Sequence, residues 1–68
     1  MNERCERAIA NARAAWQAYE LVPRGPTRDR AQRAYNAARR GMRSVLFSAL
    51  VPRGEINRIE REIEGSDY

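Results

Sequence analysis

Apolar residues recur at steps of three and four along most of this chain, which is the spacing of one face of an α-helix. The pattern forms three runs, over residues 2–20, 27–50 and 55–64. The apolar positions of the three runs are Cys5, Ile9, Ala12, Trp16 and Tyr19, then Ala31, Tyr35, Ala38, Met42, either Val45 or Leu46, and Ala49, then Ile56, Ile59 and Ile63. No stretch alternates as a half-buried strand does, so the pattern predicts three amphipathic helices and an all-α fold.

Two proline-containing segments, 21–26 and 51–54, interrupt these runs, and we expect both to be loops. Pro23 lacks a backbone donor and biases the residue before it away from the helical conformation. The second helix then starts with Pro26 at its first position, or after a Thr27 cap. Loops this short join antiparallel neighbours. We therefore predict a small three-helix bundle, in which a long antiparallel hairpin carries the short third helix laid across it.

The length of the chain limits its core. Its 68 residues form one domain at most, and a chain of this size buries only about 60% of the surface that it exposes when unfolded. Eleven of its hydrophobic residues are Ala, which leave little apolar area for a monomer. We therefore expect a homo-oligomer, with a dimer of the helical hairpin as one form.

The missing residue types exclude most catalytic and metal chemistry. The chain has no His and a single Cys, so it lacks the usual general base at neutral pH and the ligands of a structural zinc site. We predict a protein that is not an enzyme and holds no metal or cofactor. One Cys forms no internal disulfide, and no apolar run reaches membrane-spanning length, so we expect a cytoplasmic protein without membrane contact. All thirteen cationic residues are Arg, which is typical of a high-GC bacterial or phage source.

Charge is distributed unevenly along the chain. Residues 1–20 carry three Arg and three Glu, net zero; residues 21–54 carry eight Arg and one Asp, net +7; residues 55–68 carry two Arg and five acids, net −3. On a helical wheel, five residues of the second run fall opposite its apolar side, namely Arg33, Asn36, Arg40, Arg43 and Phe47. We predict that they form an outward, partner-binding stripe. The guanidinium fork matches carboxylates and phosphates, and an exposed aromatic side chain can anchor an interface.

Two classes of partner are open for this stripe. The first is an acidic protein surface, which would make the chain a small helical interaction protein such as a phage or bacterial regulator or inhibitor. The second is RNA or DNA, because a row of Arg also follows a phosphate backbone. Residues 27–43 resemble the arginine-rich helices with which some phage antitermination proteins bind an RNA hairpin, and this resemblance implies an RNA partner. The alternative to both is a solvated face without a partner.

The acidic third run complements the basic second run. We expect its four Glu residues to fold back on the Arg-rich helix or to reach that helix in a second copy; they are Glu55, Glu60, Glu62 and Glu64. Local pairing of Arg58 with Glu62 is the alternative.

The pentapeptide LVPRG occurs twice, at residues 21–25 and 50–54. It resembles the thrombin recognition sequence that is built into many engineered proteins. The resemblance implies cleavage after Arg24 and Arg53, and makes an engineered helical scaffold with cleavable loops a third interpretation. The alternative is turn chemistry, in which Val-Pro forces an extended exit and Gly permits the turn. Either origin predicts that both segments lie outside the helices.

Overall fold

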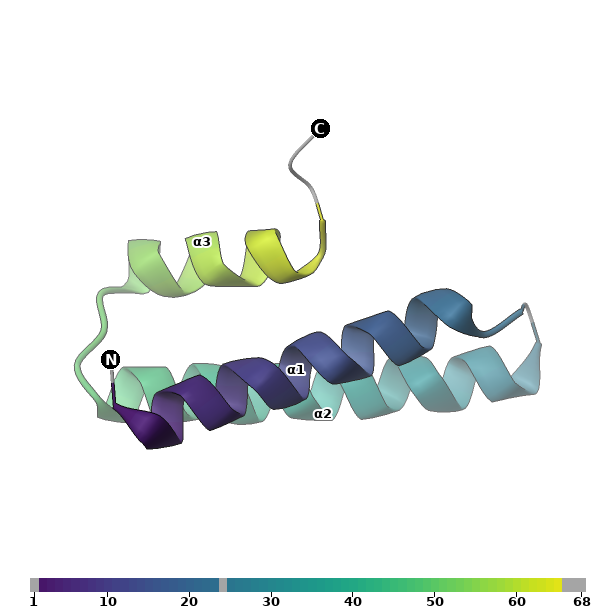
Figure 1. The fold of residues 1–68 in the computed structure, drawn as a ribbon, viewed down its shortest axis with the longest axis horizontal. Coiled ribbons are helices and arrows are strands. Elements are labelled where there is room, and N and C mark those ends of the chain that lie inside the picture. The colour runs from purple at the N-terminus through teal and green to yellow at the C-terminus, as the bar shows by residue number, and fades with distance from the viewer. Residues whose placement is uncertain (1, 24, 66–68) are drawn as a thin grey trace.

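The computed structural model describes residues 2–23 and 25–65, which form three helices (Figure 1). They are α1 (Glu3–Leu21), α2 (Pro26–Ser48) and α3 (Arg53–Ile63), and the described residues contain no strand. Helices α1 and α2 lie side by side as a long antiparallel hairpin, and α3 runs along only one half of it. The predicted all-α bundle is therefore confirmed.

The two helices of the hairpin begin at local capping signals. The side chain of Asn2 accepts a hydrogen bond from the backbone N–H of Cys5 at 2.8 Å, which caps the start of α1. Helix α2 begins with Pro26 in its first turn after Gly25, whose φ of 136° suits a residue without a side chain. Of the two predicted starts for this helix, the structure therefore has the one at Pro26. Residue 24 lies outside the described residues, and the predicted cleavage at Arg24 lies there with it.

Helix α2 ends in a tight turn that differs from the predicted loop. The backbone N–H of Val51 donates to the carbonyl of Leu46, and that of Leu50 donates to the carbonyl of Phe47, both at 3.0 Å. This pair of bonds is a Schellman motif, whose left-handed position Gly normally occupies. Here that position holds Leu50, with a φ of 64°. The chain consequently leaves α2 after Ser48, two residues earlier than predicted.

Helix α3 starts earlier than the sequence pattern predicted. Pro52 is its N-cap, with a φ of −59°, and Arg53 and Gly54 lie in the first helical turn. The prediction that residues 51–54 form a loop is therefore wrong for Arg53 and Gly54. The physical reason is that a proline lacks only its own N–H and restricts only the residue before it, so a helix can begin directly after it; the carbonyl of Pro52 accepts the first helical hydrogen bond from the backbone N–H of Ile56 at 3.0 Å.

The core is a single cluster along the inner faces of the three helices. Its buried members are Cys5, Ala12, Tyr35, Met42, Leu46, Ile56, Ile59 and Ile63. All eight are among the predicted apolar positions, Leu46 as the alternative to Val45. Trp16 is only half-buried, and its ring lies 4.9 Å from that of Tyr35 and 5.3 Å from that of Tyr19. Among the described residues, no helix is long and apolar enough to cross a membrane.

Candidate interaction surface

The solvent-facing side of α2 carries a straight row of exposed residues at spacings of three and four. Its members are Arg30, Arg33, Ala37, Arg40, Ser44 and Phe47, which we call the outer row. Seven residues turn an α-helix by nearly two full turns, so positions seven apart stay almost in line. Arg33, Arg40 and Phe47 follow one another at this interval. No ion pair engages the three Arg of the outer row within residues 2–23 and 25–65.

The structure divides the stripe that the sequence predicted. Arg33, Arg40 and Phe47 are exposed and lie in the outer row, whereas Asn36 is half-buried. Arg43 instead turns toward α3, where its Nη1 donates to Oδ1 of Asn57 at 3.1 Å and to a carboxylate oxygen of Glu60. The helical wheel did not include Arg30 in the predicted stripe. Arg30 lies three residues before Arg33, a helical spacing that could have identified it from the sequence.

One carboxylate of α3 holds two guanidinium groups of α2. Glu60 accepts from Nη1 of Arg39 at 3.1 Å and from Nη1 of Arg43, and its own side chain is only 17% exposed. Two cations against one anion leave an excess charge of +1 at this contact. Burial of Glu60 strengthens the attraction, because less water screens the charges. The sequence did not point to Arg39, which lies between the predicted apolar face and the predicted stripe.

A second contact ties the C-terminal end of α3 to the hairpin. The hydroxyl of Tyr35 donates to Oε2 of Glu64 at 2.7 Å. Burial, together with the hydrogen bond to Glu64 and its negative charge, raises the pKa of Tyr35 well above its ordinary value. The phenol therefore stays protonated and remains a donor at neutral pH. The prediction that the acids of the third run fold back on the second helix is confirmed for Glu60 and Glu64.

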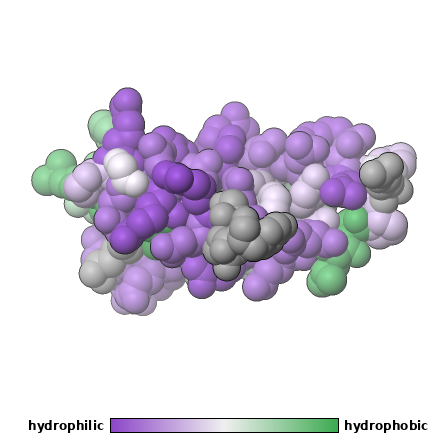
Figure 2. Space-filling model, turned by 90° about the horizontal axis from the view of Figure 1, so that it is seen from above, coloured by the Kyte–Doolittle hydropathy of each residue, from purple (hydrophilic) through white to green (hydrophobic). Residues whose placement is uncertain are grey.

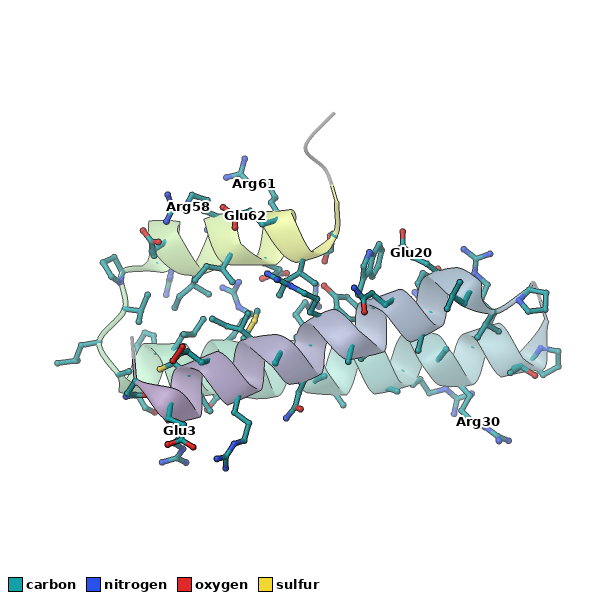
Figure 3. All side chains as sticks on the ribbon, in the orientation of Figure 1. Glu3, Glu20, Arg30, Arg58, Arg61 and Glu62 are labelled. Atoms are coloured by element: carbon teal, nitrogen blue, oxygen red, sulfur yellow. The ribbon has the colours of Figure 1, made fainter. Side chains whose placement is uncertain are left out.

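The other two acids of α3 pair locally with Arg58, which the alternative predicted for Glu62 but not for Glu55. Arg58 donates to Glu55, and its Nε lies 4.0 Å from Oε1 of Glu62. Figure 3 shows Arg58, Arg61 and Glu62 pointing away from the hairpin on the outer side of α3. This outer side therefore carries charges of both signs.

The outer row ends at a cleft between the last turns of α2 and the first turns of α3. The cleft measures about 270 Å³, and we call it the end cleft; it is lined by Arg43, Ser44, Phe47, Ser48, Arg53 and Ile56. Phe47 is 67% exposed and Leu50, in the adjoining turn, is 89% exposed. Figure 2 shows the apolar surface of this side mainly at the two ends of the molecule, one of them near the turn from α2 to α3. An exposed apolar surface rimmed by polar groups is typical of a binding site.

The chain matches no protein-family model, no curated protein and no solved structure. Fold and surface together define a small all-α three-helix protein with a basic row that ends at a partly apolar cleft.

Proposed function

We propose that this chain is a small interaction protein that binds an acidic protein partner through the outer row of α2. One observation carries the proposal: Arg33 and Arg40 are exposed and lie in line with the exposed Phe47. A row at this interval faces a second helix along its length, as in coiled coils. The small Ala37 and Ser44 alternate with the larger side chains and allow such a helix to approach closely.

The apolar end of the row favours a protein over a nucleic acid. Interfaces with DNA are strongly basic and polar, whereas hot spots between proteins combine Arg with aromatic side chains. The outer row joins Arg40 to Phe47 and continues into a cleft whose wall includes the buried Ile56. Carboxylates of the partner would pair with Arg33 and Arg40, and an apolar group would cover Phe47.

Binding of two labelled polyanions tests the proposal. The first probe is a polyglutamate peptide of about 20 residues, and the second is a single-stranded RNA of about 20 nucleotides; both are measured by fluorescence anisotropy at physiological salt. We expect tighter binding of polyglutamate, and we expect replacement of both Arg33 and Arg40 by Gln to weaken it about tenfold. The matched control replaces Arg4 and Arg13 of α1, which are also exposed, and should change the affinity less than twofold.

The salt dependence of binding shows whether the partner is a nucleic acid and not an acidic protein. A nucleic-acid partner would bind RNA more tightly than polyglutamate. Replacing Arg33 and Arg40 would then lower the slope of the logarithm of the binding constant against the logarithm of the salt concentration by about 1.4, because each lost phosphate contact contributes about 0.7. That result would overturn the proposal. Equal losses in the outer-row variant and the α1 variant would overturn it as well, because they would show attraction to net charge alone.

A further inference from the structure

The end cleft has the size and the lining of a site for one aromatic side chain. Its volume of about 270 Å³ exceeds the roughly 150 Å³ of a cavity that holds benzene, and lies below the roughly 300 Å³ at which small-molecule pockets begin. Phe47 and Ile56 supply apolar walls, while Ser44 and Ser48 supply hydroxyl groups. A tyrosine ring combines an apolar body with a polar tip and matches both kinds of wall.

The charge of the end cleft calls for an anion beside that ring. Arg43 and Arg53 line the cleft, and none of the six lining residues is acidic. Arg43 and Arg39 both pair with Glu60. The single negative charge of Glu60 balances only one of these two positive charges. Arg53 is exposed and has no ion pair among the described residues. The site therefore fits an aromatic residue next to a carboxylate.

The sequence of this chain contains such a pair. Residues 66–68 read Ser-Asp-Tyr, so that Asp67 stands directly before Tyr68. The segment follows an acidic stretch, since residues 55–65 carry four Glu and two Arg, whereas residues 21–54 carry a net charge of +7. Attraction between these two parts of different copies would also account for the uneven charge of the chain.

The distance that residues 66–68 can span decides whether the cleft binds the Asp67–Tyr68 segment of its own chain or that of a second copy. Residues 66–68 span at most about 11 Å of extended backbone. Gly65, from which they continue, lies nine residues beyond Ile56, the lining residue nearest to it along the chain, which corresponds to about 14 Å along a helix. The backbone of the segment thus falls short of the cleft of its own chain. We propose that the end cleft binds the Asp67–Tyr68 segment of a second copy of this protein, an association that goes beyond the function proposed above.

Leu21 is another exposed apolar side chain among the described residues, and it fits the cleft less well. Leu21 is 85% exposed and lies at the opposite end of the hairpin. Helix α2 starts at that end with Arg28 and Arg30 in its first two turns, so an approach of Leu21 would bring these cations against Arg53. The Asp67–Tyr68 segment brings the opposite charge.

Sedimentation equilibrium of the full chain from about 10 μM to 1 mM tests this association. We expect the average mass to rise with concentration, and we expect Tyr68→Ala and Phe47→Ala each to weaken self-association at least tenfold. Leu21→Ala removes an exposed apolar side chain at the opposite end of the hairpin and should change nothing. The decisive measurement mixes Tyr68→Ala, which keeps the cleft, with Phe47→Ala, which keeps the segment. The mixture should associate one to one where neither variant associates alone.

A peptide of residues 61–68, amidated at its end and labelled, tests the cleft directly. We expect it to bind the full chain, with about a threefold to tenfold loss for Arg53→Gln and for Asp67→Asn in the peptide, and no change for Arg33→Gln. Because Arg33 belongs to the outer row, failure of the function proposed above would leave this result intact. A chain that stays monomeric at 1 mM, a mixture that does not associate, or a peptide indifferent to Tyr68→Ala would each overturn the inference.

Discussion

Replacing Glu60 by Gln tests whether one carboxylate holds α3 against the Arg-rich face of α2. A hydrogen bond to a charged group contributes about 1.5–3 kcal/mol, and Glu60 accepts two of them. The side chains of Arg39 and Arg43 are 37% and 38% exposed, so water screens part of this attraction. The amide of Gln also keeps one acceptor oxygen. We therefore expect the free energy of unfolding to fall by about 1–2 kcal/mol.

Urea unfolding followed by circular dichroism measures this loss. With a slope near 1 kcal/mol per molar urea for a small protein, the midpoint should fall by about 1–2 M. Glu62→Gln is the matched control, because it removes the same charge from the same helix. Its side chain is 61% exposed and lies 4.0 Å from Arg58, so the control should lose no more than about 0.3 kcal/mol.

Equal losses for Glu60→Gln and Glu62→Gln would refute this account, since they would show that the net charge of α3 matters and the pairing does not. A double variant adds a second check. If Arg43 pairs with Glu60, the combined loss from Arg43→Gln and Glu60→Gln should be smaller than the sum of the two single losses by at least about 0.5 kcal/mol.

Two further predictions concern the turn after α2 and the link between Tyr35 and Glu64. Leu50→Gly relieves a left-handed backbone and should raise the free energy of unfolding by about 0.5 kcal/mol, while the β-branched Leu50→Val should lower it by about 1 kcal/mol. Thermal unfolding gives the order, and a Val variant at least as stable as the Gly variant would contradict it. For Tyr35, the folded chain holds the proton beyond the pH at which the unfolded chain releases it, because folding raises its pKa. The stability that this provides is complete below the unfolded pKa of about 10 and declines above it, by up to about 1.4 kcal/mol per pH unit. Urea midpoints between pH 9 and 11 should therefore fall more steeply for the native chain than for Tyr35→Phe, and parallel curves would count against the raised pKa.

Much of the fold was predictable because its signals are local. The steps of three and four in the sequence identified seven of the eight buried residues and gave the eighth, Leu46, as an alternative to Val45, since a helix places such positions on one face whatever it packs against. Proline and the residue before it also act locally, so the connector between α1 and α2 was expected in nearly the right place. The start of α3 was missed because a proline interrupts a helical pattern in the sequence, yet it does not prevent a helix from beginning at the next residue.

The candidate surface was only partly predictable. The wheel placed Arg33, Arg40 and Phe47 on the exposed side of α2, but it treated Arg43 as their equivalent. Whether an Arg on that side meets solvent or an acid depends on where α3 lies, and no spacing within α2 contains that information. The acids of α3 were likewise expected to act together, yet Glu60 and Glu64 face the hairpin while Glu55 and Glu62 pair with Arg58.

The sequence by itself determined three helices, the face that each one buries and a basic middle segment, because these properties follow from neighbours within a few turns. Tertiary structure alone decided which Arg of α2 pair with α3 and where the end cleft forms. The cleft exists because the turn at Leu50 brings the last turns of α2 against the first turns of α3. That arrangement depends on packing between helices, where a small change in the turn would separate Phe47 from Arg53 without altering either helix.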